Sequence, residues 1–318
     1  MTKDDILFLD IQLRDVTCIL FVCDTYLYPK ANDFYGKLMY TNKRVHGPYM
    51  QPRKKSSQIL FNCAYRYTTD NILKPLTDEE LQEIGKSLGL MQGLGLDKHL
   101  CGIPEGSKVV FLHAPSFLEY YSSDETQSLA DEIGITYGVD PKDLRITGGL
   151  HLFHPSVAEA HDVDIVVPID SLDQVRTVFN HVESRKNKPV VEFGYVWPLR
   201  WFSTDGHLVC PFFIYRNLTL PIERLTFTGQ HYHSKVYITD DMYSIFNAPL
   251  LITEGGVGLV FCRSTLLRGM LRKNQIIHLN CPLYVVSQGS FVGEQVAVIT
   301  NPFKEITNIL EILNEYRT

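Results

Sequence analysis

The sequence contains no long hydrophobic run and no strong excess of charge of one sign. A membrane-spanning helix needs about 20 consecutive apolar residues, and no segment approaches that length, so we expect no membrane partner. The first residues, MTKDDILFLD, are acidic and lack a signal-peptide profile, so we expect a cytoplasmic protein. A formal net charge of -6 argues against a basic nucleic-acid-binding surface over the whole chain, but it leaves local patches open.

Paired cysteine spacings are also missing. A disulfide framework needs cysteine pairs and a structural zinc site needs short Cys-x-x-Cys spacings, so the odd count of seven predicts neither. Free cysteines are among the most buried residue types. We therefore expect buried free thiols for most of the set, which comprises Cys18, Cys23, Cys63, Cys101, Cys210, Cys262 and Cys281.

The length of 318 residues favours two or three domains over one. Residues 1–120 combine strand-like runs with helix signals, which predicts an N-terminal α+β domain. Residues 121–220 alternate helix and strand signals, and residues 221–318 contain many short β runs divided by turns. We therefore expect a middle α+β domain and a C-terminal β-rich accessory domain.

Capping residues and apolar periodicity predict the main helices. The basic cluster Arg53-Lys54-Lys55 is interpreted as a solvated loop, although it could contact phosphate. Two apolar runs, Val190–Phe193 and Leu208–Tyr215, predict strands. The expected helices run from Thr77 to about Gly89 or Gly93, from Ser123 through Tyr137, from Ser171 to about Glu183, and from Glu305 to Tyr316.

The stretch RITGGLHLFHPSVAEAHDVDIVVP, residues 145–168, contains the candidate chemistry. A short apolar strand leads into Gly148 and Gly149, and a loop of twelve residues is expected to follow. Asp162 and Asp164 then stand at the head of the next apolar strand. Side chains two residues apart on a strand share a face, so the two carboxylates are expected to lie side by side.

Two carboxylates at that separation repel each other unless a cation lies between them. Mg²⁺ suits such a pair because it keeps several waters and binds substrate phosphates as further ligands. Glycines let the backbone approach a ligand and direct its N–H groups at a phosphate. Each feature alone is common, since Asp-X-Asp also occurs in solvated turns and Gly-Gly in ordinary loops. Their order and spacing favour a functional site.

The combination resembles the DNA polymerase beta-type nucleotidyltransferase superfamily, with Ile146-Thr147-Gly148-Gly149 followed by Asp162-Val163-Asp164-Ile165. The longer stretch from Gly138 through Val167 is also similar to small nucleotidyltransferase-domain proteins common in archaea. The resemblance implies an α+β fold with a nucleotidyltransferase-like mixed sheet over residues 121–220. It implies that Asp162 and Asp164 are catalytic and bind two Mg²⁺ (or Mn²⁺) ions, and that Gly148 and Gly149 hold the triphosphate of an NTP.

The sequence departs from that family at the third carboxylate, which lies on a later strand in the family. Cys210 stands where this acid is expected. A thiol is a poor ligand for Mg²⁺, which is a hard cation. Asp205 or Glu192 could replace the missing acid from a neighbouring position.

Three hypotheses follow. The protein transfers a nucleoside monophosphate from an NTP to an acceptor hydroxyl, with nucleic acid among the possible acceptors. Alternatively, it is a nucleotidyltransferase-like module that binds nucleotide or nucleic acid without turnover, which the cysteine favours. In the third, the aspartate pair is structural and the chain is an unrelated α+β protein. The acceptor, the preferred NTP and the oligomeric state do not follow from the residues.

Overall fold

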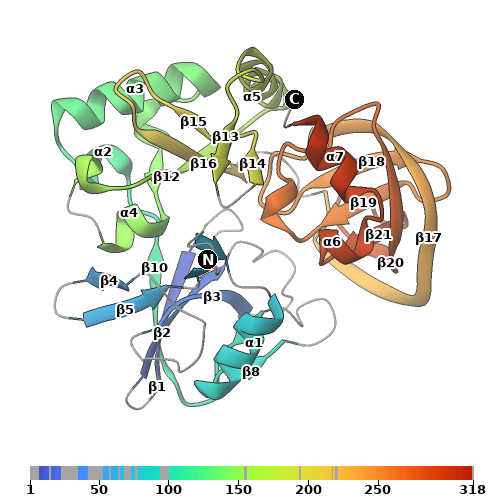
Figure 1. Ribbon diagram of the computed structural model, residues 1–318, viewed down its shortest axis with the longest axis horizontal. Helices are drawn as coiled ribbons and strands as arrows, with labels where there is room; N and C mark the ends of the chain where they lie inside the picture. The colour runs from blue at the N-terminus through green and yellow to red at the C-terminus, as the bar shows by residue number, and fades with distance from the viewer. Residues whose placement is uncertain are drawn as a thin grey trace. The chain divides into compact units, whose positions relative to one another are not determined.

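The computed structural model describes residues 7–13, 16–22, 35–41, 53–56, 59–63, 65–67, 73–75, 78–93, 100–153, 156–192, 195–216, 218 and 221–316. The chain divides into two compact units. Unit 1 comprises Met1–Ala114 with His151–Pro155, and unit 2 comprises Pro115–Leu150 with Ser156–Thr318. Both units contain helices and strands (Figure 1), which confirms the α+β class. The expected domain division at residues 220/221 stays a prediction. Residues 221–318 lie in unit 2, as do residues 121–220 except for His151–Pro155.

Unit 1 contains an eight-stranded sheet with the path β10-β1-β2-β3-β5-β4, to which β8 and β9 attach through β3. Its helix α1, Asp78–Ser87, confirms the first helix prediction. The loop predicted at the basic cluster is wrong, because Arg53–Ser56 form strand β4 and pair with β5. Charged side chains are common on such a terminal strand, because they discourage further pairing. The other strands are β1 (Leu7–Leu13), β2 (Val16–Val22), β3 (Tyr35–Thr41), β5 (Ile59–Cys63), β6 (Tyr65–Tyr67), β7 (Leu73–Pro75), β8 (Met91–Gln92), β9 (Cys101–Gly102) and β10 (Lys108–His113).

The first part of unit 2 contains a four-stranded sheet in the order β11-β12-β16-β15. Strand β12 is antiparallel to β11 and parallel to β16, so the sheet is mixed. A two-stranded sheet, β13-β14, accompanies it. The elements are α2 (Phe117–Tyr120), α3 (Asp124–Tyr137), β11 (Arg145–Ile146), α4 (Gly148–Phe153), β12 (Val163–Ile169), α5 (Leu172–Ser184), β13 (Val190–Glu192), β14 (Tyr195–Trp197), β15 (Trp201–Phe202) and β16 (Leu208–Tyr215).

Helices α3 and α5 confirm two helix predictions, and both begin at the expected serine caps. The Ser123 hydroxyl accepts a hydrogen bond from the backbone N–H of Thr126. Ser171 and Gln174 form a reciprocal capping box. These contacts satisfy N–H groups that have no partner inside the helix.

The loop of twelve residues predicted after the Gly-Gly turn is wrong. Helix α4 occupies Gly148–Phe153, and a 3-10 turn occupies Val157–Glu159. Gly148 has a φ of 61°, which lets the chain turn directly from β11 into the helix. Leu150 is fully buried and anchors this short helix. A helix of six residues is too short to show an apolar periodicity in the sequence.

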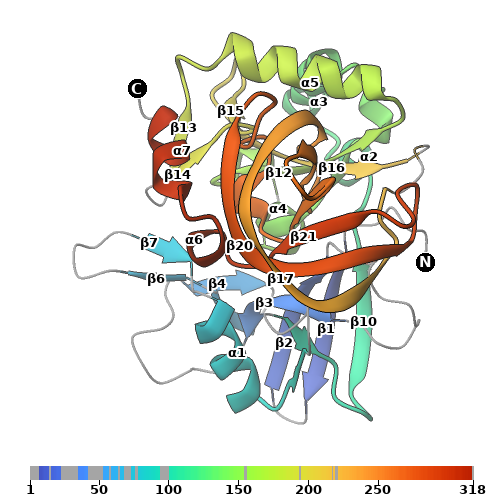
Figure 2. The same ribbon diagram turned by 90° about the vertical axis from the view of Figure 1, so that its right-hand side faces the viewer.

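The four-stranded sheet has one face against helices α3 and α5 (Figures 1 and 2). Alternate residues of β12, including Val163 and Ile165, are buried in the core. On β16, Phe213 lies 5.2 Å from Tyr137 of α3, measured between ring centroids. Because side chains alternate along a strand, Asp164 and Cys210 point to the opposite face.

The C-terminal part of unit 2 forms a closed barrel in the order β17-β18-β19-β21-β20. Only β19 and β21 are paired in parallel among these strands. The barrel strands are β17 (Arg224–Tyr243), β18 (Leu250–Glu254), β19 (Leu259–Cys262), β20 (Ile276–Gln288) and β21 (Gln295–Ile299).

Short β runs were expected here, but two of the strands are long. The 20 residues of β17 pair with both β18 and β20 and contain register shifts that allow the strand to curve. The closing helix predicted from Glu305 to Tyr316 begins later in the structure, as α7 (Ile309–Glu315), because Ile306 forms a bridge with Leu279. A further short helix, α6 (Pro302–Glu305), precedes this bridge.

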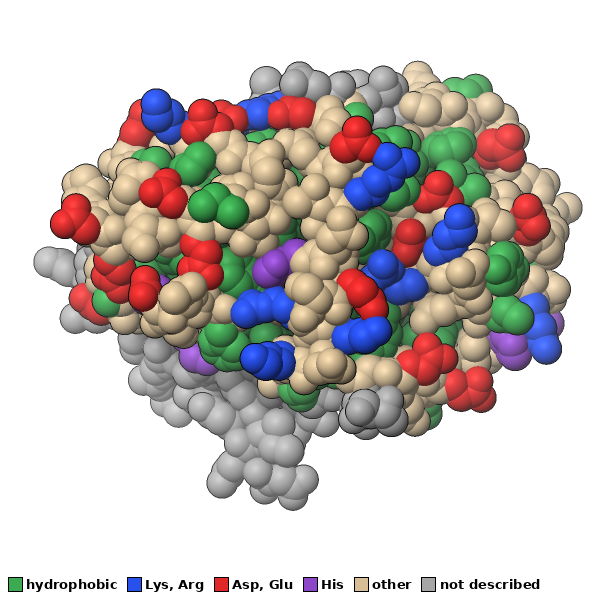
Figure 3. Space-filling view, turned by 90° about the horizontal axis from the view of Figure 1, so that it is seen from above, with side chains coloured by type: hydrophobic (Ala, Val, Ile, Leu, Met, Phe, Trp, Pro, Cys, Tyr) green, Lys and Arg blue, Asp and Glu red, His purple; other side chains and the backbone are tan. Residues whose placement is uncertain are grey.

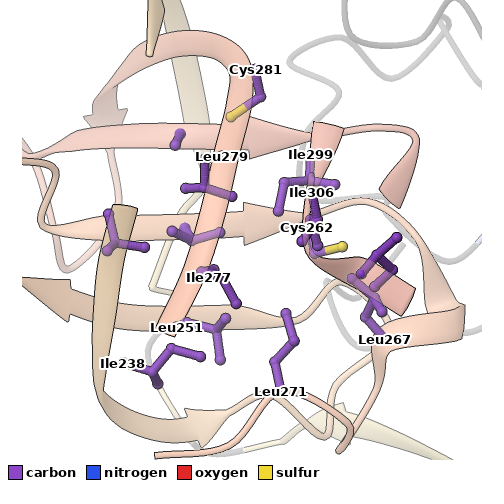
Figure 4. Close-up of a cluster of buried hydrophobic side chains, with 14 of the residues drawn as sticks. Ile238, Leu251, Cys262, Leu267, Leu271, Ile277, Leu279, Cys281, Ile299 and Ile306 are labelled. Atoms are coloured by element: carbon purple, nitrogen blue, oxygen red, sulfur yellow. The ribbon is translucent and has the colours of Figure 1, made fainter. Parts of the chain in front are cut away.

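Aliphatic side chains and two cysteines fill the barrel (Figure 4). Ile238, Leu251 and Ile277 meet at one end of this core, and Cys262 and Cys281 lie within it. The five cysteines whose burial the structure describes are all free and buried, which confirms the expectation for most of the seven. None of the helices in the described part of the chain has the length and apolar character that crossing a membrane requires.

The barrel holds strand β16 through the connection between β17 and β18. Phe246 of that connection stacks on Tyr215 with ring centroids 3.8 Å apart. It also forms a bridge with Phe213. The buried side chain of Arg268 donates through Nη1 to the carbonyl of Pro211 and to Oδ1 of Asn247, at 3.0 Å each. Strand β16 is therefore fixed from the barrel side.

Candidate functional site

The candidate site lies along one row of residues that crosses the four-stranded sheet. Asp164 on β12 pairs with Cys210 on β16. Ile146 pairs with Ile165, so Thr147 stands opposite Asp164, and its N–H donates to the Asp164 carbonyl at 3.0 Å. On the other side Trp201 pairs with Val209, which places Arg200 opposite Cys210. Residues in one cross-strand row point to the same face.

The two predicted aspartates are brought together with the cysteine. One ligand atom from each of Asp162, Asp164 and Cys210 lies within 4.8 Å of the other two. The Cys210 thiol donates to Oδ2 of Asp162 across 3.6 Å. The carboxylates are partly exposed and the thiol is fully buried. This arrangement leaves the carboxylate side of the cluster accessible to a ligand.

The Gly-Gly turn is also part of the site. A Cβ atom on Gly148 would lie 1.8 Å from Oδ2 of Asp164, so no side chain fits there without moving the aspartate. The N–H of Gly149 donates to the same Oδ2 at 3.2 Å. The backbone donor expected to hold a phosphate is therefore hydrogen-bonded to the candidate metal ligand in this structure.

Arg200 lies beside the acids, a position that no sequence pattern predicts. Its guanidinium forms an ion pair with Glu192 and lies over the ring of Trp197, 4.4 Å from the centroid. The side chains of Arg200 and Glu192 are 13% and 15% exposed. Burial acts to lower the pKa of Arg200, but coulombic interactions with Cys210, Glu192 and the two aspartates raise it above its ordinary value.

Neither proposed substitute for the third carboxylate completes the cluster. Glu192 is engaged by Arg200. Asp205 is an exposed residue of a turn. Cys210 itself occupies the position opposite Asp164. Burial raises the pKa of this thiol well above its ordinary value, while the charge of Arg200 acts to lower it. Without a bound cation Cys210 is therefore a neutral thiol.

The sequence signals found only part of this site. Asp162, Asp164, Gly148 and Gly149 were identified from spacing, and the structure brings all four together. Arg200 stands between Trp197 and Trp201 in the sequence, and no spacing connects it with the two aspartates. Its place depends on the register of β15 against β16, which no sequence pattern displays.

An aromatic cluster supports the sheet on the helix-covered face. Trp201 donates through Nε1 to the hydroxyl of Tyr137 at 2.7 Å. His181 of α5 lies 5.0 Å from Trp201, measured between ring centroids. Its Nε2 is buried and has no hydrogen-bond partner among the described residues. Burial and then the charge of Arg185 lower the pKa of His181 to about 4.

This depressed pKa predicts an acid-sensitive fold. The unfolded chain binds a proton at His181 near pH 6.5, whereas the folded protein binds it only near pH 4. Unfolding is therefore increasingly favoured as the pH falls between these values. We expect His181→Phe to lose less stability than the wild type between pH 7 and pH 5 in urea titrations. Equal losses in both proteins would contradict this assignment.

No family model, curated protein or solved structure matches the chain. The chemistry assigned to the site therefore rests on its own residues and contacts.

Proposed function

We propose that the protein is a metal-dependent nucleotidyltransferase that moves a nucleoside monophosphate from an NTP to an acceptor hydroxyl. The proposal includes a nucleotidyltransferase-like sheet formed by β11, β12, β15 and β16. The observation that carries it is the contact between the Gly-Gly turn and Asp164. The Gly-Gly turn and the aspartate pair are separate parts of the resembled sequence signature. They meet so closely in the structure that a Cβ atom on Gly148 cannot be accommodated beside Asp164.

The carboxylate pair fits the cation that this reaction needs. Asp162 and Asp164 offer hard oxygen ligands on one face of the sheet, and Mg²⁺ or Mn²⁺ binds such oxygens together with phosphate. When bound, the cations would polarise the phosphate and the attacking hydroxyl.

The Gly-Gly backbone is proposed to bind the β- and γ-phosphates. Its Gly149 N–H is held by Asp164 in this structure, so it becomes available when the aspartate turns toward a cation. A phosphate oxygen can then replace the carboxylate oxygen as the acceptor. Binding of cation and nucleotide is therefore expected to be coupled through Asp164.

The decisive experiment combines binding with turnover. A ligand that binds only the folded state raises the melting temperature. We expect an NTP with Mg²⁺ or Mn²⁺ to raise it in the wild type, and we expect this shift to disappear in Asp162→Asn. NTP consumption should fall to background in Asp162→Asn/Asp164→Asn. Asp205→Asn, in an exposed turn, is the matched control and should keep both properties. Unchanged NTP consumption by the double variant would refute the mechanism.

A second function, nucleotide binding without turnover, is favoured by the position of Cys210. A protonated thiol stands opposite Asp164, where the resembled family has its third acid, and it cannot accept a proton from an acceptor hydroxyl. Under this alternative Cys210→Asp gains NTP consumption that the wild type lacks. Measurable turnover by the wild type would exclude it.

The described part of the surface that Figure 3 shows gives little support for a nucleic-acid acceptor. On the face shown in Figure 3, acidic and basic side chains of the described residues are interspersed among apolar ones. OB-type barrels bind oligonucleotides on the face of their second and third strands. In this five-stranded barrel the second strand, β18, is largely buried and the third, β19, is buried along its whole length. A small acceptor hydroxyl is therefore the simpler expectation for this site.

A further inference from the structure

The distances within the Asp162, Asp164 and Cys210 cluster suit a cation that accepts sulfur. A tetrahedral Zn²⁺ has a Zn–S distance of about 2.3 Å and Zn–O distances of about 2.1 Å, which place a sulfur and an oxygen ligand about 3.6 Å apart. The Cys210 sulfur and Oδ2 of Asp162 are 3.6 Å apart. The third ligand atom, from Asp164, is within 4.8 Å of both. A small movement of the partly exposed aspartate completes the three-ligand set.

The formal charges around the cluster also call for a divalent cation. Asp162, Asp164 and Glu192 contribute three negative charges, and Arg200 contributes one positive charge. The balance is -2 while Cys210 keeps its proton. Carboxylates gathered on a partly buried face repel one another, and a divalent ion removes that cost.

Thr147 supplies an independent indication of a missing ligand. Its side chain is 1% exposed, and its hydroxyl has no hydrogen-bond partner among the described residues. Buried polar atoms in native proteins are almost always paired with protein, water or an ion. Thr147 stands opposite Asp164 in the cross-strand row, so its hydroxyl lies on the face that carries the cluster. An oxygen ligand on a bound cation would supply the absent partner.

The identity of the ligands decides which cation is favoured. Thiolate sulfur selects Zn²⁺ and related ions, whereas Mg²⁺ binds oxygen. Three protein ligands with one open position are typical of zinc sites that act on a bound oxygen.

We propose that Asp162, Asp164 and Cys210 bind one thiophilic divalent cation of the Zn²⁺ type and leave its fourth position open on the Thr147 side. On binding, the S–H bond of Cys210 breaks, a sulfur–metal bond forms and the proton leaves to solvent, with no change in the oxidation state of the metal. This inference deepens the proposed function and rests on it only in placing a cation between the two aspartates.

The test uses Co²⁺ as a spectroscopic substitute for Zn²⁺ on the full chain without nucleotide. We expect a thiolate-to-cobalt charge-transfer absorption at one equivalent of Co²⁺, displaced by Zn²⁺ and unaffected by excess Mg²⁺. Cys210→Ser should lose this absorption. Cys281→Ala is the matched control, since that thiol is buried inside the barrel, and it should keep the absorption. Absence of the absorption in the wild type, or its persistence in Cys210→Ser, overturns the proposal.

Two further variants protect the test against misfolding of the cysteine variant. Asp162→Asn changes a partly exposed side chain and should weaken Co²⁺ binding about tenfold or more while the melting temperature without metal stays close to the wild type. Thr147→Val keeps the side-chain shape and should weaken binding about tenfold. Wild-type Co²⁺ affinity in both variants refutes the assigned ligands.

The same experiment separates this inference from the proposed function. A Co²⁺ absorption that depends on Cys210, in a protein that consumes no NTP, supports the cation site and rejects the transferase. NTP consumption with Mg²⁺, in a protein that gives no Co²⁺ absorption, supports the transferase and rejects the thiophilic cation.

Discussion

Alanine in place of Gly148 is expected to destabilise the protein by about 2 to 5 kcal/mol. Two effects combine in this estimate. The φ of 61° is unfavourable for any residue with a Cβ atom, and the new Cβ would also lie 1.8 Å from Oδ2 of Asp164 and 2.5 Å from its Cγ. The chain must either lose this packing or expel Asp164 from the site. Urea unfolding measures the first outcome, and loss of any response to metal reports the second.

Gly138 provides a matched control, because it has nearly the same backbone conformation without the contact. Its φ is 67°, and a Cβ atom there meets nothing within 4 Å. Gly138→Ala should therefore cost only the backbone strain, about 1 to 2 kcal/mol. Adding Asp164→Ala to Gly148→Ala should recover part of the loss, since the two shortest contacts disappear. Equal destabilisation by Gly148→Ala and Gly138→Ala would show that the contact with Asp164 does not contribute to the free energy of unfolding.

Methionine in place of Arg200 is expected to cost about 3 kcal/mol or more of unfolding free energy. The guanidinium is the positive partner of a nearly buried ion pair with Glu192, and it neutralises the acids around it. Removing one member of such a pair leaves the other charge desolvated and unpaired. Methionine keeps much of the side-chain volume over Trp197, so the loss reports mainly the charge.

Changing both members of the pair tests this explanation. Arg200→Met/Glu192→Gln leaves no unpaired charge at these two positions, so it should regain most of the stability that the single variant loses. Arg176→Met breaks an exposed ion pair with Asp173 on helix α5 and should leave stability nearly unchanged. If the double variant is as unstable as Arg200→Met alone, the stabilising role of Arg200 is packing and not charge.

Local signals in the sequence predicted the elements that local physics determines. Ser123 and Ser171 begin helices α3 and α5 because their side chains satisfy nearby backbone N–H groups. Strand β16 occupies the predicted run from Leu208 to Tyr215, since an apolar run buried on both faces has a clear pattern.

Pairing between distant segments was not predictable in the same way. Strand β17 was expected only as part of the short β runs of residues 221–318, because half of its residues are exposed and resemble loop residues. The helix predicted from Glu305 to Tyr316 is longer than the observed one, because Ile306 pairs with Leu279 of β20 instead of continuing the helix.

The candidate site shows the same division. Spacing alone indicated Asp162 and Asp164, because side chains two residues apart on a strand share a face. The contact of Gly148 with Asp164 and the place of Arg200 depend on how separate strands meet. A single sequence contains no measure of that register, so Thr147 and Arg200 enter the site only through the structure.

The contacts that Phe246 and Arg268 make with strand β16 affect how the protein unfolds on heating. Phe246 stacks on Tyr215, and Arg268 donates to the carbonyl of Pro211, so both connect the barrel to the strand that carries Cys210. Sheet and barrel should therefore unfold in one cooperative transition and not in two separate steps. Weakening this connection with Arg268→Ala should therefore lower the melting temperature of sheet and barrel together, and the proposed cation ligands should separate in the same transition.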